Sequence, residues 1–242
     1  SPNWFNFVCA KIAGYIFCYP AKLHVLGLEN LPLSGAFLLI ANHISHFDPP
    51  ILSSVVPRPV EWIATRELFE GPISGRFLRW VGGIPLDRIR GDGHALREAI
   101  HRLRNGAVVG IFPEGGIRSG ENSLLSNAWG KPGFTTLATL SRAPIIPCAI
   151  LGSDRLYETK YWNPVQQIVT RQRASIWIAF GKPMDCPTSL PRQHARSLLQ
   201  NQIIASIRSL AASLKEHFGL QAADFPQTAQ QRRGQKSGPK KK

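Results

Sequence analysis

A histidine and an aspartate stand close enough in this sequence to act as a pair. They are His43 and Asp48, in the stretch 42–48. A neutral imidazole can take a proton from an alcohol if its own proton sits on the correct ring nitrogen, and a carboxylate bound to the other nitrogen fixes that tautomer. The pair could therefore activate a substrate hydroxyl directly, without a serine or cysteine nucleophile.

A second interpretation of Asp48 comes from the two prolines that follow it. Pro49 and Pro50 indicate a helix that starts here, because proline is favoured near the first helical position. Asp48 could then be an N-cap whose carboxylate accepts hydrogen bonds from the backbone of that helix. The spacing of His43 and Asp48 alone does not decide between catalysis and capping.

A second segment combines an acid, two glycines and an arginine in a turn that follows an apolar run. The run ends at Phe112, and Glu114, Gly115, Gly116 and Arg118 come after it. Glycines let backbone N–H groups approach an anion closely, and a guanidinium offers a planar fork for phosphate oxygens. The segment lacks the Gly-Lys-Ser/Thr ending of a P-loop, so it indicates a different kind of anion site.

A third segment, residues 82–88, offers another arginine at the end of a short strand. Arg88 could bind the same anion as the turn. Taken by itself, the segment is explained better by an exposed ion pair between Asp87 and Arg88.

Together and in this order, the segments resemble the glycerolipid acyltransferase family, enzymes similar to 1-acyl-sn-glycerol-3-phosphate (lysophosphatidic acid) acyltransferase. The resemblance covers residues 25–185 and rests on four blocks, at 42–48, 83–88, 112–119 and 143–147. A Lys-x-Gly element, Lys131-Pro132-Gly133, also matches. The third block departs from the family pattern, because Gly116 and Ile117 stand where the family has one residue. This insertion shifts Arg118 along the turn.

The resemblance implies transfer of a fatty acyl group from a thioester to a free hydroxyl of a glycerolipid phosphate. His43 would deprotonate the sn-2 hydroxyl of lysophosphatidic acid, and Asp48 would orient His43. The alkoxide would attack the thioester without an acyl-enzyme. The acceptor would be bound by residues of the later blocks: Arg88, Glu114, Gly115, Arg118 and Lys131. Within that set, Glu114 would position the acceptor or brace an arginine.

The co-substrate implied by the resemblance is acyl-CoA or acyl-ACP, the acyl form of acyl carrier protein, and no cofactor is expected. The acceptor stays open, because glycerol-3-phosphate, another lysophospholipid or a lyso-ornithine lipid would suit the same blocks. A non-catalytic lipid-binding relative is a further alternative. A nucleic-acid-binding protein is disfavoured, because no recognition motif accompanies the basic residues.

The net charge of +14 favours partners that carry negative charge. Membrane lipids, an anionic bilayer surface and the acidic acyl carrier protein fit the resemblance. The expected location is the cytoplasmic face of an inner membrane, or a plastid membrane if the source is plant-like. The four cysteines have neither CxxC nor zinc-ligand spacing, so reduced thiols and no metal are expected. A disulfide between Cys148 and Cys186 is the alternative.

Apolar runs alternate with helical patterns along the middle of the chain. The apolar runs lie at 36–41, 59–64, 107–112, 144–151 and 174–180. The helical patterns lie at 49–56, 72–80, 92–105, 127–141 and 192–218. This alternation predicts a single α/β domain over residues 22–220, with a mixed or parallel sheet flanked by helices. Sites in such sheets lie beyond the carboxyl ends of the strands, where His43 and Glu114 fall.

Both ends of the chain are expected to lie near the membrane. Residues 4–19, wound as a helix, place aromatic and aliphatic side chains on one arc, which predicts an amphipathic membrane-interface helix within residues 1–21. An ordinary packed helix is the alternative. Residues 221–242 predict a basic disordered tail, either a membrane tether or a plain solvated tail. No apolar stretch is long enough to predict a membrane span.

Overall fold

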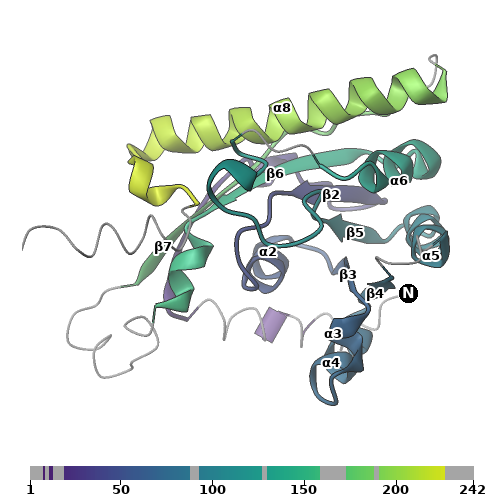
Figure 1. Cartoon of the computed structure of the whole chain (residues 1–242), viewed down its shortest axis with the longest axis horizontal. Coiled ribbons are helices and arrows are strands. Elements are labelled where there is room, and N and C mark those ends of the chain that lie inside the picture. The colour runs from purple at the N-terminus through teal and green to yellow at the C-terminus, as the bar shows by residue number, and fades with distance from the viewer. Residues whose placement is uncertain are drawn as a thin grey trace, which may run out of the picture.

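The computed structural model describes residues 8, 11–12, 19–87, 93–126, 130–158, 173–187 and 191–226 (Figure 1). Most of the amphipathic helix predicted within residues 1–21 lies outside the described residues. Arg88 and residues 227–242 lie outside them as well.

One mixed sheet of seven strands forms the centre of the domain, in the order β1-β7-β6-β2-β5-β3-β4. Strands β6 and β7 pair antiparallel, and the other neighbours run parallel. The strands are β1 (Ala21–Leu26), β2 (Phe37–Ala41), β3 (Val60–Thr65), β4 (Ile84–Leu86), β5 (Val108–Ile111), β6 (Ile145–Leu151) and β7 (Ala174–Phe180). The predicted α/β class with a mixed sheet is confirmed.

The five apolar runs expected to be strands are confirmed as β2, β3, β5, β6 and β7. Strand β1 was not expected. It lies at the edge of the sheet, and Lys22 and His24 interrupt its apolar pattern. The other edge strand, β4, has only three residues and is the short strand expected within residues 82–88.

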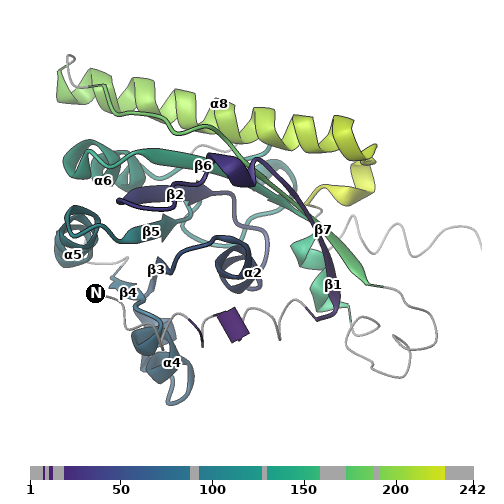
Figure 2. The same cartoon turned by 180° about the vertical axis from the view of Figure 1, so that it is seen from behind.

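Helices cover both faces of this sheet (Figures 1 and 2). One apolar core packs α5, α6 and α8 on one face, and a second packs α2 on the other. The helices are α2 (Asp48–Val55), α3 (Glu67–Glu70), α4 (Ser74–Trp80), α5 (Gly93–Arg104), α6 (Gly133–Ser141) and α8 (Arg192–Phe218), and the 3-10 turns are η1 (Leu28–Asn30), η2 (Gly120–Asn122), η3 (Ser153–Tyr157) and η5 (Ala222–Asp224). Within the described part of the chain, no helix is long and apolar enough to span a bilayer.

Helix α6 begins at Gly133, later than the helical pattern that was expected from residue 127. The backbone N–H of Lys131 donates to the carbonyl of Pro113 at 2.8 Å. This bond holds the residues before the helix against the turn that follows β5. Lys131 therefore belongs to the loop at the end of the sheet rather than to the helix.

Strands β2 and β5 bring the two principal sequence blocks together. Every residue of β2 is buried, and β2 pairs parallel with β5, with Ile40 opposite Ile111. Parallel neighbours end at the same edge of a sheet, so the loops that start at Asn42 and Phe112 emerge side by side. Asn42 extends this edge: its amide side chain donates to the carbonyl of Ile150 at 2.9 Å and accepts from the N–H of Ile150 at 2.8 Å.

The folded chain continues past residue 220, where the predicted domain ended. Turn η5 follows α8, and the guanidinium of Arg155 forms an ion pair with Asp224. The carbonyl of Pro226 accepts from the N–H of Gly120 at 3.1 Å. Residues 221–226 therefore pack on the domain instead of starting the tail.

Candidate active site

His43 and Asp48 form a hydrogen-bonded pair at the carboxyl edge of the sheet. Nδ1 of His43 lies 2.9 Å from Oδ2 of Asp48. The histidine side chain is 14% exposed, whereas the aspartate side chain is fully buried. This contact places a proton on Nδ1 and leaves Nε2 as the ring nitrogen with a lone pair for an incoming hydroxyl.

The capping interpretation of Asp48 does not match the structure. Asp48 is the first residue of α2, and no side chain caps that helix. Its Oδ2 instead accepts from the backbone N–H groups of Ile44 at 2.8 Å and Ser45 at 2.9 Å, both of which precede it. Its Oδ1 accepts from the hydroxyl of Ser153 at 2.5 Å. The carboxylate therefore closes the 43–48 loop and faces the histidine, with its buried charge well supplied with donors.

Glu114 joins the two loops of the site. Its Oε2 accepts from the backbone N–H of His43 at 2.5 Å, and its Oε1 accepts from the N–H of Leu124 at 2.6 Å. We expected this carboxylate to position the acceptor or to brace an arginine. The structure uses both of its oxygens to hold backbone, because the side chain is only 5% exposed and must satisfy its acceptors internally.

Burial raises the pKa of Glu114 from 4.5 to about 7. The negative charge of Asp48 raises it further, while the two backbone donors and the charge of Arg118 oppose the shift. Glu114 is therefore a buried acid that titrates near neutral pH.

An aromatic stack fixes the orientation of the His43 imidazole. The ring of Phe112 stacks on His43 with centroids 4.1 Å apart and an interplanar angle of 16°. The ring of Trp62 in turn stacks on Phe112, with centroids 4.6 Å apart and an interplanar angle of 6°. The indole N–H of Trp62 donates to the hydroxyl of Ser53 at 2.9 Å. The stack limits tilting of the His43 ring out of its plane, and the bond to Asp48 limits its rotation within that plane.

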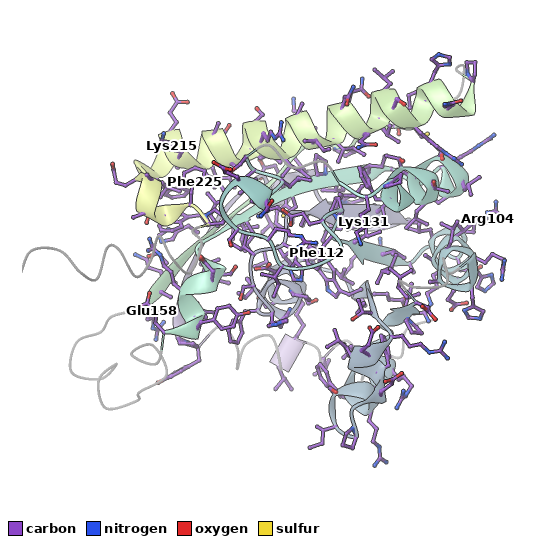
Figure 3. The ribbon with its side chains drawn as sticks, viewed as in Figure 1. Arg104, Phe112, Lys131, Glu158, Lys215 and Phe225 are labelled. Atoms are coloured by element: carbon purple, nitrogen blue, oxygen red, sulfur yellow. The ribbon has the colours of Figure 1, made fainter. Side chains whose placement is uncertain are left out.

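The glycine turn carries the basic residues expected to bind an anion. Gly115 has a φ of 64°, the left-handed region that favours glycine, and a Cβ there would lie 3.0 Å from Cδ of Lys131. The stem of Lys131 thus lies against the turn, near Phe112 in Figure 3. The N–H of Arg118 donates to the carbonyl of His43 at 2.9 Å, and both cationic side chains are exposed.

The structure brings six of the seven residues expected at the site to the loops that follow β2 and β5, or to the segment bonded to them: His43, Asp48, Glu114, Gly115, Arg118 and Lys131. Of these, Glu114 is buried beneath the surface. Arg88 falls outside the described residues. Oδ2 of Asp87, its expected ion-pair partner, lies 3.7 Å from Nη1 of Arg66.

Two residues of turn η3 support the site and carry no sequence signal that identifies them. Ser153 donates to Asp48, and the hydroxyl of Tyr157 accepts from the N–H of His46 at 2.9 Å. The ring of Tyr157 also packs on Phe47, with centroids 5.4 Å apart. Both contacts join segments that are distant in the chain, so only the folded arrangement reveals them.

Among the described residues, Cys148 and Cys186 are free thiols, and Cys148 is fully buried. Burial raises the pKa of the Cys148 thiol well above its usual value, and the charge of Asp48 adds to that shift. A raised pKa disfavours the thiolate, so Cys148 is poorly suited to act as a nucleophile.

An apolar cavity of about 370 Å³ lies on the α5–α6 face of the sheet. Its lining includes Ile63, Leu86, Leu96, Ile111 and Leu137. Ile111 is the last residue of β5 and immediately precedes Phe112. The cavity therefore reaches the strand end from which the site loop emerges.

A mixed α/β sheet with a histidine–aspartate pair and a basic glycine turn at its carboxyl edge has the groups that an enzyme acting on a hydroxyl beside an anion needs. A protein-family model described as Acyltransferase matches residues 22–151. The chain belongs to the Acyltransferase family, and its activity class is that of an O-acyltransferase.

Two relatives of this chain are named 1-acyl-sn-glycerol-3-phosphate acyltransferase. The chain is 30% identical over 145 residues to a 1-acyl-sn-glycerol-3-phosphate acyltransferase of Bacillus subtilis strain 168. The matched region covers 60% of this chain and 70% of the relative. It is 24% identical over 206 residues to the enzyme of the same name from Borreliella burgdorferi, covering 84% of this chain and 77% of the relative.

The fold also matches a solved structure. The crystal structure of the 1-acyl-sn-glycerophosphate (LPA) acyltransferase PlsC from Thermotoga maritima superposes with a TM-score of 0.63 at 24% identity. The match covers 85% of this chain and 80% of the other. At this identity the likeness shows a shared fold.

Proposed function

We propose that the protein transfers a fatty acyl group from a thioester to the sn-2 hydroxyl of lysophosphatidic acid, giving phosphatidic acid. The observation that carries the proposal is the 2.9 Å contact between Nδ1 of His43 and Oδ2 of Asp48, on a loop bonded to a basic glycine turn. This arrangement supports a base for a hydroxyl and a site for a phosphate at one edge of the sheet. Relatives named 1-acyl-sn-glycerol-3-phosphate acyltransferase support this choice of acceptor.

In the proposed reaction, Nε2 of His43 accepts the proton of the sn-2 hydroxyl as its oxygen attacks the thioester carbonyl. The new C–O bond forms while the carbonyl π electrons move to the oxygen. Collapse of this tetrahedral intermediate breaks the C–S bond, and the imidazolium returns its proton to the departing thiolate. Asp48 holds the reactive tautomer and stabilises the imidazolium between these two steps.

The acceptor phosphate is proposed to bind over the glycine turn. Lys131 lies against Gly115, and Arg118 follows the turn, so both exposed cations can face an anion at the same edge as His43. Backbone N–H groups near Gly115 would add uncharged donors. Arg88 follows β4 in the chain and is proposed as a third cation for the same phosphate.

The apolar cavity beside Ile111 is proposed to hold a fatty acyl chain. Its lining is aliphatic, and it lies next to the strand end that carries Phe112. Pockets of a few hundred cubic ångströms with apolar walls are typical of sites that bury a hydrophobic ligand. The donor, acyl-CoA or acyl-ACP, would leave its thiol carrier outside this cavity.

The test measures free thiol released from acyl-CoA or acyl-ACP in the presence of lysophosphatidic acid. We expect acceptor-dependent release by the wild type and a loss of about 10²- to 10⁴-fold for His43→Ala. His101→Ala is the matched control, because His101 is exposed on α5 and binds Asn105. Equal activity of His43→Ala and His101→Ala would refute the proposed base. A panel with glycerol-3-phosphate, other lysophospholipids and a lyso-ornithine lipid defines the acceptor.

A further inference from the structure

Helices α3 and α4 form a hairpin that exposes a cluster of large apolar side chains. In both views, the hairpin projects from the side of the domain opposite α8 (Figures 1 and 2). The exposed fractions are 46% for Leu68, 82% for Ile73, 38% for Phe77 and 37% for Trp80. We call these four residues the hairpin patch. Exposed apolar patches of this kind mark contacts with another phase or another molecule.

The hairpin is a firmly packed unit, so the patch is a stable feature of the fold. Phe69 is buried at its centre, and its carbonyl accepts from Nη1 of Arg79 at 2.9 Å. Gly75 packs so closely that a Cβ there would lie 2.0 Å from the same carbonyl. The hydroxyl of Ser74 closes the connection by donating to the carbonyl of Leu68 at 3.1 Å.

We propose that the hairpin patch inserts into the interface of an anionic lipid bilayer and docks the enzyme there. This inference rests on the proposed function, because lysophosphatidic acid is an amphiphile that resides in membranes. The hairpin projects from the domain, and Ile73, in the connection between its two helices, is the most exposed of the four apolar side chains, as expected of a segment that enters lipid. Aliphatic residues beside a tryptophan and arginines are the types found where a bilayer meets water.

The charges around the patch agree with an anionic surface. The hairpin carries exposed Arg66, Arg76 and Arg79 against exposed Glu67 and Glu70, and the whole chain has a net charge of +14. Arginine stems can lie along apolar surface while the guanidinium reaches a phosphate headgroup. The excess of positive charge therefore favours binding to a negatively charged bilayer over binding to a neutral one.

The N-terminal segment adds a second contact on the same side of the domain. Ile12 is 54% exposed, while Lys11 is held against the end of α2 by a bond of 2.8 Å to the carbonyl of Ser54. Figures 1 and 2 both place this short piece on the hairpin side of the domain, away from α8. Two separate segments with exposed apolar side chains thus lie on one side of the domain.

The hairpin is also connected to the active-site edge of the sheet. It starts at the carboxyl end of β3, where the N–H of Arg66 donates to the carbonyl of Leu86 at 3.0 Å. The same edge carries the loops of His43 and Glu114. Docking through the hairpin would therefore hold that edge close to the bilayer from which the acceptor comes.

The decisive variant is Ile73→Asp. Ile73 lies just before α4 and its side chain is 82% exposed, so the substitution adds charge to the patch without removing a packed side chain. Phe77→Ser is the second variant. Leu198→Asp is the matched control, because Leu198 is 41% exposed on α8, on the opposite side of the domain. Circular dichroism and thermal unfolding verify that each variant is folded.

The measurement is co-sedimentation of the full chain with vesicles of phosphatidylglycerol and phosphatidylcholine. We expect Ile73→Asp to weaken binding by at least about tenfold, because an exposed isoleucine that would be buried in the bilayer is replaced by a charge. Leu198→Asp should bind like the wild type. Equal binding by Ile73→Asp and Leu198→Asp would overturn the inference.

A second measurement separates this inference from the proposed function. With short-chain lysophosphatidic acid that is soluble as monomers, Ile73→Asp should transfer acyl groups at the wild-type rate, and with vesicle-embedded acceptor it should be slower. No activity of the wild type on either acceptor would refute the proposed function and leave the vesicle result to decide the docking surface. A defect of Ile73→Asp confined to acyl-ACP, with normal vesicle binding, would assign the patch to the carrier protein and overturn the membrane inference.

Discussion

The hydroxyl of Ser153 donates to Oδ1 of Asp48 at 2.5 Å, although the two residues are 105 positions apart and both are fully buried. The bond connects turn η3 after β6 with the loop after β2. It occupies the oxygen of Asp48 that does not face His43. Ser153 therefore fixes the rotation of the carboxylate, which in turn fixes the plane of the imidazole.

Removal of the Ser153 hydroxyl should lower kcat and leave the affinity for the acceptor nearly unchanged. Ser153→Ala leaves Oδ1 of Asp48 unsatisfied in the interior, which costs about 1–3 kcal/mol and lets the carboxylate rotate. We expect kcat to fall about tenfold, with little change in the KM for lysophosphatidic acid. Ser153→Cys, which keeps a weak donor at similar volume, should be intermediate. If Ser153 had a purely structural role, kcat would fall equally in both variants. The loss would then follow their thermal stability and not the strength of the hydrogen-bond donor.

Asp48→Asn should be a stronger catalytic defect with a preserved fold. The amide keeps the shape of the carboxylate but cannot stabilise an imidazolium, and it can favour the wrong tautomer of His43. We expect kcat to fall about 10²- to 10⁴-fold. Single-turnover thiol release measures this step without the contribution of product release. Wild-type turnover in Asp48→Asn would show that the pair serves only to fold the loop.

Much of the scaffold could be predicted because burial leaves a periodic trace in the sequence. Strand β2 is an unbroken apolar run and is buried along its whole length, and α8 carries its buried residues Leu199, Ile203 and Ile207 at helical spacing. Parallel strands then place the loops after β2 and β5 at one edge, which brings His43 and Glu114 together. These inferences need only local patterns and one topological rule.

The remaining parts of the site depend on long-range packing and have no local pattern. Phe112 looked like the end of a strand, and its stacking between His43 and Trp62 follows from where β3 and α2 lie. Glu114 looked like a ligand for the acceptor because its burial could not be read from its neighbours. Ser153 lies outside every block, so its partner could be identified only from the folded chain.

Lys131 and Arg118 should affect acceptor binding more than turnover. Each exposed cation is expected to contribute a charge-assisted hydrogen bond to the acceptor phosphate, which is worth roughly 1.5–3 kcal/mol. We expect the KM for lysophosphatidic acid to rise roughly 10- to 100-fold in Lys131→Ala and in Arg118→Ala, with a smaller change in kcat.

Arg104→Ala is the matched control for charge, because Arg104 is exposed on α5 and lies away from Lys131 in Figure 3. A monoacylglycerol, which lacks the phosphate, should be used equally poorly by the wild type and by the two variants. Kinetics in which Arg104→Ala matches Lys131→Ala would assign the effect to net charge and would remove the phosphate site from the glycine turn.

Glu114 should make stability depend on pH in a direction opposite to that of most carboxylates. Its pKa in the folded chain is about 7, above its usual 4.5, so the folded state binds the proton more tightly than the unfolded state. This contribution to stability is fully present below pH 4.5 and is lost as pH rises through 7. The shift corresponds to about 3 kcal/mol.

The measurement is the difference in unfolding free energy between wild type and Glu114→Gln across this range, which cancels the titration of all other groups. The difference should fall with rising pH, because only the wild type carries the group. A difference that stays constant, or one that rises, would show that the two backbone donors from His43 and Leu124 outweigh burial and keep Glu114 ionised.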